Sequence, residues 1–252
     1  MSFATIETKV QGATGWIRLN RPQVRNALSA QCFAELDEAL VLFGDNKEVR
    51  SVVLIGNGGN FSSGRDFKDR DVPPDFEERR ARTFTNLETF PKPTIAAVAG
   101  YAITGGMTLA LACDLILAAS NAVFQDTHAR LGALTLRASR VYEVLGPLKA
   151  RELLFTCRRV DAHDALDMGL VNRVVDPDEL ESSAAELAAE INSHDPQVVA
   201  GIKRVINKVL REDQFRLLEL EELEKRRFND LKSERSAMDK GLELIAKPKE
   251  QA

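Results

Sequence analysis

The stretch KPTIAAVAGYAITGGMTLALACDLILAA, residues 92–119, decides the fold of this 252-residue chain. No charged residue lies between Pro93 and Cys113, a length that could cross a bilayer. However, PTIAAVAG is a short apolar run that ends in glycine, and Gly105 and Gly106 interrupt the segment again. Buried parallel strands are also continuously apolar. The pattern therefore favours a buried strand, a turn, a short helix from Gly105 and a second strand, and not a membrane span.

Outward from this stretch, the preceding residues alternate between apolar runs and helical patterns. Strands are predicted over residues 4–10, 14–20 and 51–58, and helices over residues 28–44 and 75–90. Gly12 marks the turn between the first two strands, while Ser29 and Gly44 are typical of a helix start and stop. Strands alternating with helices in this way favour a mostly parallel sheet.

The residues after about Asp176 have a different character, with helical periodicity and no convincing strand. Helical patterns cover residues 176–196, 197–213, 214–230 and 233–247. The sequence thus predicts an α/β core over residues 1–175, followed by an α-helical region over residues 176–252. Charge-rich runs in that region, such as LLELEELEKRRF, indicate amphipathic helices with a solvated face.

Composition limits the classes of partner and the compartment. Lys plus Arg number 34 and Asp plus Glu 38, a net charge of −4 that argues against nucleic acid. Cys32, Cys113 and Cys157 suit neither a disulfide framework nor a metal site. The N-terminus lacks a basic region followed by an apolar core, so no secretion signal is expected. These features favour a cytoplasmic protein without a bound metal. RNA binding through the basic helix IKRVINKVLR is an alternative that the net acidity opposes.

Two glycine-containing loops follow predicted strands, where ligands bind in sheets of this kind. They are GNFSSGRDF, residues 59–67, and GYAITGGMTLALACD, residues 100–114. Alone, either loop could be an ordinary surface turn. Together they could supply two backbone amides that bind one oxyanion, which would suit thioester or enolate chemistry.

These loops belong to a larger set of motifs that resembles the enoyl-CoA hydratase/isomerase (crotonase) family over residues 4–245. The motifs are RPQVRNALS, FSSGRDFKD, the stretch at 92–119, VFQ and DALDMGLVNRVV. The resemblance implies a crotonase (ClpP-like) spiral of ββα units with a C-terminal α-helical trimerisation region. It also implies an acyl-CoA substrate, a homotrimer or dimer of trimers, and no cofactor beyond the coenzyme A of the substrate.

The resemblance also assigns roles to individual residues. The family pattern Ala-Gly-x-Asp corresponds to residues 63–66, which places the first oxyanion amide on Arg65. The pattern Gly-Gly-Gly-x-Glu-Leu-Ala corresponds to residues 104–110, which places the second amide on Gly105. The residues matching the coenzyme A and acyl-pocket segments are Arg25, Ala27, Ser63, Gly64, Asp66, Phe67 and Lys68.

Both glutamates of a family hydratase are absent. Thr108 stands at the first glutamate position and His128 at the second. A hydroxyl does not act as a general acid or base near neutral pH, whereas an imidazole does. We expect His128 to move the proton, with Asp126 orienting its ring or serving as a second acid. Alternatively, His128 bonds a neighbouring loop and Asp126 caps a turn.

Three further features leave the substrate and reaction open. The Arg65 side chain could pair with a carboxylate on the acyl group, or it could point to solvent or pair with Asp66 or Asp69. After Leu131 and Gly132, the sequence ALTLRASRVYEVLG lacks the family's glycines, which predicts a remodelled acyl pocket. The family's closing Lys-Arg element reads AKPKE. The resemblance to the family implies hydration or dehydration. Hydrolysis of a thioester or of a carbon–carbon bond is an alternative reaction, and a further alternative is that the protein binds acyl-CoA without catalysing a reaction.

Overall fold

The computed structural model describes residues 3–69, 72–135 and 137–231. Its main sheet has six strands in the order β1-β2-β3-β4-β6-β9. They span Ile6–Gln11, Thr14–Leu19, Ser51–Gly56, Thr94–Val98, Leu115–Ala119 and Arg173–Val175. β1 is antiparallel to β2, and all other neighbours in this sheet are parallel. The predicted mostly parallel sheet is therefore confirmed.

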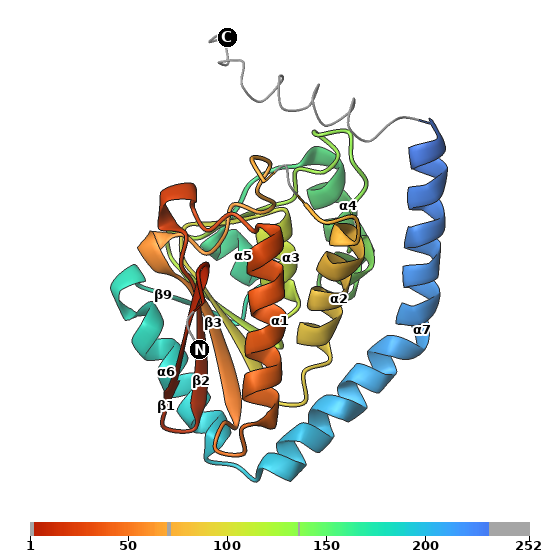
Figure 1. The fold of residues 1–252 in the computed structure, drawn as a ribbon. Helices are drawn as coiled ribbons and strands as arrows, with labels where there is room; N and C mark the ends of the chain where they lie inside the picture. The colour runs from red at the N-terminus through yellow and green to blue at the C-terminus, as the bar shows by residue number, and fades with distance from the viewer. Residues whose placement is uncertain (1–2, 70–71, 136, 232–252) are drawn as a thin grey trace.

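Helices cover both faces of this sheet (Figure 1). One face packs against α1 (Ala30–Asp45), α2 (Phe76–Glu88) and α3 (Gly105–Leu111), and the other against α6 (Leu180–Asn192). β3 shows the reason, since Val52 and Leu54 join the first apolar cluster and Val53 and Ile55 join the second. Successive side chains of a strand point to opposite faces, so a strand covered on both sides is apolar throughout.

A second, smaller sheet was not predicted, and its first strand lies within the glycine-containing loop expected at residues 100–114. It consists of β5 (Tyr101–Ile103), β7 (Val123–Gln125) and β8 (Val160–Asp161). Ala102 is paired with Phe124 in β7 and, on its other side, forms an isolated parallel bridge with Ser62. Strands of two or three residues carry too little periodicity to be recognised. This sheet brings residues near 62, 102 and 124 side by side.

The remaining helices are α4 (Ala138–Thr156), α5 (Ala162–Met168) and α7 (Pro196–Leu231), with 3-10 turns at Pro22–Val24, Asn57–Gly59 and Pro177–Glu179. The predicted helices over residues 197–213 and 214–230 are wrong as separate elements, because α7 is continuous through both. No glycine or proline lies between Ile202 and Leu231 to end it. The predicted helix at 233–247 and the AKPKE segment lie outside the described residues.

α6 packs directly on the sheet of the core through Leu180, Ala184, Leu187 and Ala188. The division at residue 176 stays a prediction. Among the described helices, none combines the length and the apolar character needed to cross a bilayer.

Polar contacts attach α7 to the core, including the bond that the Asn207 amide group donates to the Glu88 carbonyl at 3.1 Å. The Lys203 ammonium donates to the Asp114 carboxylate at 2.6 Å and to the Lys92 carbonyl at 3.0 Å. Further along the helix, the Glu221 carboxylate accepts the Ser139 amide at 2.7 Å. Burial raises the pKa of the Glu221 carboxyl, because desolvation penalises its charged form.

The Glu221 pKa predicts a pH dependence of stability. A carboxyl whose folded pKa is raised binds its proton more tightly in the folded state, so the free energy of unfolding falls as pH rises above the ordinary value of 4.5. This fall ends once the folded carboxyl ionises. Glu221→Gln keeps an oxygen acceptor and has no charge, so its stability relative to wild type should increase with pH across that window. Urea unfolding at several pH values measures this. Glu219→Gln changes an exposed position of the same helix, and its free energy of unfolding should vary with pH as that of the wild type does.

Candidate active site

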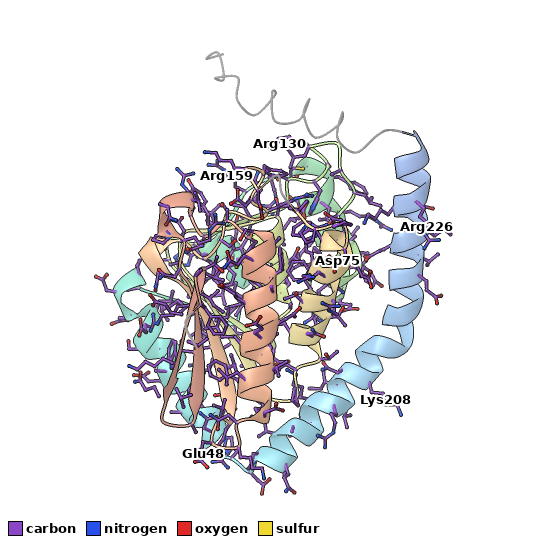
Figure 2. The ribbon with its side chains drawn as sticks, in the orientation of Figure 1. Glu48, Asp75, Arg130, Arg159, Lys208 and Arg226 are labelled. Carbon is purple, nitrogen blue, oxygen red and sulfur yellow. The ribbon has the colours of Figure 1, made fainter. Side chains whose placement is uncertain are left out.

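A cavity of about 410 Å³ lies at the end of the molecule where Arg130 and Arg159 are found, opposite Glu48 (Figure 2). The charged residues that line it are Arg25, Arg65, Glu77, Arg80, Arg130, Arg159 and Lys225, and the polar ones include Ser63, Thr104, Gln125, Thr127 and His128. Phe67, Ile103, Leu131, Ala133 and Leu134 supply an apolar part of the wall. Six cations and one carboxylate give this wall an excess of positive charge.

The backbone amide of Arg65 points away from the segment that holds its loop. Leu28 donates to the Gly64 carbonyl at 2.7 Å and accepts from the Asp66 amide at 3.0 Å. In a parallel pairing of this kind, the residue between the two bonded neighbours directs its own N–H to the opposite side. Within residues 3–69, 72–135 and 137–231, no acceptor is found for the Arg65 N–H.

The amide of Gly105 is the first of helix α3, and the first amides of a helix have no acceptor within it. It lies close to the first loop, since a methyl group built on Gly105 would be 3.6 Å from the Arg65 nitrogen. One built on Gly64, whose φ is +90°, would lie 2.6 Å from the Ile103 carbonyl and 3.2 Å from the Gly105 nitrogen. Only glycine at residue 64 permits this approach.

Thr104 precedes α3 with φ of +52° and ψ of −106°, a conformation that is unusual for a β-branched residue. Its amide donates to the Gln125 carbonyl at 2.7 Å, and its hydroxyl lies 2.6 Å from the hydroxyl of Thr127. The Thr127 amide also donates to the Thr104 hydroxyl at 3.2 Å. The backbone that presents Gly105 is therefore fastened to the segment that carries His128.

Replacing Thr127 with valine removes one hydroxyl of this contact at nearly constant volume. We expect a loss of about 1 kcal/mol in stability, because the Thr104 hydroxyl loses a partner in a part-buried site. Thermal unfolding measures this loss. Thr127→Ser retains the hydroxyl and should restore most of the stability. Equal losses for valine and serine would contradict a role for the hydroxyl.

His128 and Asp126 form a dyad at the cavity. The His128 Nδ1 lies 2.9 and 3.0 Å from the two oxygens of the Asp126 carboxylate, which also accepts the His128 amide at 2.9 Å. Asp126 is only 3% exposed and His128 lines the cavity. Asp126 thus caps the local turn and orients the ring. A carboxylate at Nδ1 favours the tautomer in which Nε2 carries the lone pair. Among the described residues, no hydrogen bond or ion pair engages Nε2.

Neither Thr108 nor the buried thiols of Cys32 and Cys113 can replace His128 as the reactive group of the cavity. The Thr108 hydroxyl donates to the Thr104 carbonyl at 3.1 Å within α3, and Thr108 is absent from the cavity lining. Burial raises the pKa of the Cys32 and Cys113 thiols to about 12, so neither forms a thiolate near neutral pH. Within the part of the chain that the structure describes, His128 is the only histidine on the cavity wall.

The residues expected to bind coenzyme A divide into two groups. Arg25, Ser63 and Phe67 line the cavity, and the Arg25 guanidinium lies 5.3 Å from the centre of the Tyr101 ring. The other four, Ala27, Gly64, Asp66 and Lys68, are not part of the lining. Arg21 joins two of these, because its guanidinium pairs with Asp66 at 2.8 Å and donates to the Ala27 carbonyl at 2.6 Å. This contact holds the two loops together behind the cavity.

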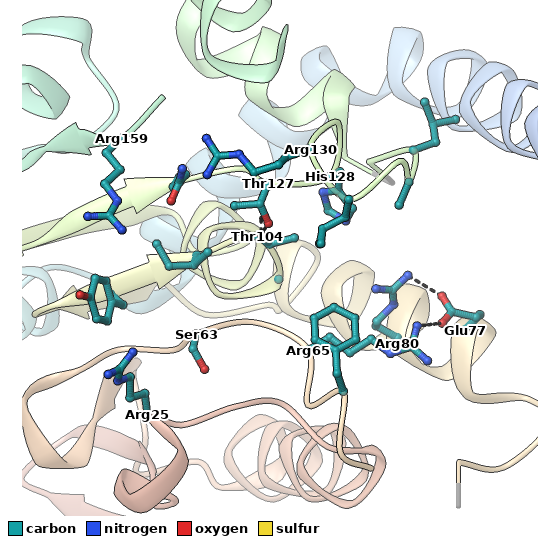
Figure 3. Close-up of a pocket in the computed structure, with 18 of the residues that line it drawn as sticks. Arg25, Ser63, Arg65, Glu77, Arg80, Thr104, Thr127, His128, Arg130 and Arg159 are labelled. Carbon is teal, nitrogen blue, oxygen red and sulfur yellow. Dashed lines mark hydrogen bonds and ion pairs between the residues drawn. The ribbon is translucent and has the colours of Figure 1, made fainter. Parts of the chain in front are cut away.

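The Arg65 side chain has a different partner from those expected. Its guanidinium pairs with Glu77 at 3.0 Å and lies over the Phe76 ring at 4.9 Å. The expected pairing of Arg65 with Asp66 or Asp69 is therefore wrong. Asp66 pairs with Arg21 instead, and Asp69 accepts a hydrogen bond from the Ala30 amide. Arg80 pairs with the other oxygen of Glu77 (Figure 3).

Comparison with known proteins identifies the family to which this chain belongs. The model for the family "Enoyl-CoA hydratase/isomerase" matches residues 9–248. The chain belongs to the enoyl-CoA hydratase/isomerase family. A probable enoyl-CoA hydratase of Rhizobium meliloti is 36% identical over 92% of this chain and 91% of its own length. A short-chain-enoyl-CoA hydratase of Clostridium acetobutylicum is 34% identical, covering 84% of this chain and 85% of the relative.

Solved structures support the same family. The crystal structure of an enoyl-CoA hydratase/isomerase from Xanthobacter autotrophicus aligns with a TM-score of 0.84 at 29% identity, covering 97% of this chain and 98% of the other. The crotonase fold expected from the sequence is thus confirmed, and so is membership of an acyl-CoA-processing enzyme family.

Several residues of this hydratase/isomerase-family cavity were not predicted. Glu77 and Arg80 come from α2, Tyr101 from β5, Thr127 and Arg130 from the segment after β7, and Arg159 from the residue before β8. The motif comparison could have suggested Thr127, which is adjacent to His128. Nothing in the sequence around Arg80 or Arg159 distinguishes them from solvated surface residues.

Proposed function

We propose that this protein is an acyl-CoA enzyme in which the amides of Arg65 and Gly105 bind the thioester oxygen as it becomes negatively charged. The observation that carries the proposal is the approach of two unengaged amides from separate loops beside the His128–Asp126 dyad. Preorganised N–H donors directed at a developing oxyanion are among the largest contributions to catalysis.

The proposed reaction is hydration of a 2-enoyl thioester, or its reverse. Nε2 of His128 removes a proton from water as the water oxygen bonds to the β carbon. The electron pair of the double bond moves onto the thioester oxygen, and the two amides stabilise this enolate. Transfer of this proton from Nε2 to the α carbon completes the addition and returns His128 to its neutral form. Asp126 is a positioning residue, because its carboxylate contacts the imidazole and lies outside the cavity lining.

The same geometry supports a second reaction. A histidine oriented by a buried aspartate also activates water for attack on a thioester carbonyl, with the amides binding a tetrahedral oxyanion. Thioester hydrolysis is therefore the second candidate function. Loss of both family glutamates favours it, because the dyad replaces a pair of carboxylates that a family hydratase uses for water addition.

The remaining assignments follow from this proposal. Arg25 and Arg159, at one end of the cavity, suit the phosphates of coenzyme A, which is part of the substrate and the one coenzyme that the reaction uses. Exposed apolar side chains on α7, including Val198, Ile202 and Val205, suit a homotrimer or dimer of trimers. The three free, buried cysteines suit a cytoplasmic location.

Two assays on the purified protein separate the candidates. Loss of the conjugated enoyl absorbance of crotonyl-CoA reports hydration, and release of free thiol from a panel of CoA esters reports hydrolysis. Binding of CoA esters without either signal would indicate a non-catalytic homologue and would contradict the proposed chemistry.

A further inference from the structure

We propose that the Gln125 side chain recognises the carrier arm of the substrate, by accepting a hydrogen bond from the amide N–H nearest the thioester sulfur. This inference rests on the proposed function, because it assigns one contact of the same acyl-CoA cavity. Gln125 lines the cavity, and the residue is only 5% exposed. No step of the proposed reaction uses its side chain.

One hydrogen bond fixes how the Gln125 amide group is turned. Its Nε2 donates to the Cys157 carbonyl at 2.6 Å. A carbonyl oxygen accepts hydrogen bonds and cannot donate them, so the group beside it is the NH2 and not Oε1. Arg130 donates to the same carbonyl at 3.3 Å. The backbone is held as well, since the Gln125 carbonyl accepts the Thr104 amide at 2.7 Å.

The Oε1 atom of Gln125 is an acceptor without a donor. Within the part of the chain that the structure describes, no N–H or O–H group donates to it. The atom is not one of the fully enclosed polar atoms, so it remains open to the cavity that Gln125 lines. Buried amide oxygens nearly always accept at least one hydrogen bond. A fixed acceptor on this wall therefore predicts a ligand group with an N–H or O–H donor.

Strand pairing places this acceptor between the coenzyme A end of the cavity and the thioester. In the smaller sheet, Ile103 of β5 is paired with Gln125 of β7. Tyr101 comes two residues before Ile103, faces the same side of the strand and lies beside the Arg25 guanidinium. Gly105 comes two residues after Ile103, so their α carbons are at most about 7 Å apart. A ligand that extends from Arg25 to the Gly105 amide must pass Gln125.

The part of coenzyme A that passes this point contains the required donor. With the phosphates at Arg25 and Arg159, the pantetheine arm runs from that end toward Thr104 near the middle of the cavity (Figure 3). Its first polar group, counted from the sulfur, is an amide N–H that follows two methylene groups. This donor is uncharged, as is the Gln125 amide that would accept it. The contact selects thioesters whose carrier arm has an amide close to the sulfur.

Two short thioesters with the same acyl group test this contact. The butyryl thioester of N-acetylcysteamine carries the amide, whereas that of 2-mercaptoethyl acetate has an oxygen in place of the N–H. Calorimetric competition against bound butyryl-CoA should show about tenfold tighter binding of the amide ester by the wild type. Gln125→Met removes the acceptor at similar side-chain length and should bring the ratio close to one. Gln31→Met, the matched control, changes an exposed glutamine outside the cavity lining whose Nε2 donates to Glu35, and should leave the ratio unchanged.

The outcomes separate this inference from the function on which it rests. Equal wild-type binding of the two short esters, or a preference that Gln125→Met retains, would overturn recognition of the arm while leaving an acyl-CoA site intact. Binding of butyryl-CoA without competition from either short ester would do the same, because the amide ester carries the proposed contact. Failure of every CoA ester to bind would overturn the proposed function as well. The wild-type comparison needs no variant, so it decides the question even if Gln125→Met does not fold.

Discussion

Replacement of His128 by alanine is expected to reduce turnover of a reactive acyl-CoA by about 10²- to 10⁴-fold, with a much smaller change in KM. The imidazole is the group that moves the proton in the proposed reaction, and it lies on the cavity wall with Nδ1 held by Asp126. Substrate binding depends on other groups, so the loss should appear in kcat. Steady-state kinetics with crotonyl-CoA, or with the most active ester of the thiol-release panel, measures it.

Two further variants make this result specific. His163→Ala removes an exposed histidine on α5, outside the cavity lining, and should behave as wild type. Asp126→Asn keeps the shape of the carboxylate but removes its charge, so it should also lower kcat by weakening the preference for the reactive tautomer. If His128→Ala retains full turnover, the imidazole has no chemical role and the proposed proton transfer is wrong.

Substitution of Gly64 by alanine is expected to lower kcat by at least about 10²- to 10³-fold, the loss typical of one oxyanion donor. The added methyl group would lie 2.6 Å from the Ile103 carbonyl and 3.2 Å from the Gly105 nitrogen. Backbone atoms cannot rotate away as a flexible side chain can, so the two loops must separate. Separation moves the Arg65 and Gly105 amides out of reach of a common oxygen.

Gly59→Ala is a matched control, because φ at Gly59 is +74° and a methyl group there meets nothing within 4 Å. It carries the cost of a left-handed alanine, about 1 kcal/mol, without a steric clash. Thermal unfolding should show a loss of stability for both variants, and kinetics should show a large loss of activity for Gly64→Ala alone. Similar activity in the two variants would mean that the amides do not act together.

The architecture was more predictable than the cavity, because the sheet is encoded in apolar runs. Val52 to Ile55 are all apolar since helices cover both faces of β3, and the same holds for β4 and β6 within residues 92–119. β5 and β7 were missed because three residues show no periodicity. Their existence depends on pairing with each other and with Ser62, and sequence periodicity does not report such pairing.

At the cavity, motif comparison predicted the positions of Gly105 and His128, and the short spacing to Asp126 suggested a dyad whose geometry the structure describes. The partner of Arg65 could not be predicted in this way. Glu77 is twelve residues away on another element and reaches Arg65 through the packing of α2 beside the loop. Contacts of this kind depend on tertiary structure, so they have no local sequence signal.

Both amides proposed to bind the oxyanion belong to the main chain, while side chains from several other elements, such as Arg25, Tyr101 and Arg159, line the rest of the cavity. Changing a side chain on the cavity wall therefore leaves the anion-binding backbone in place. Mutation of lining residues other than His128 could shift this protein from one ester to another without first losing the chemistry, which makes these residues suitable positions for a saturation library and His128 and the glycines positions to hold constant.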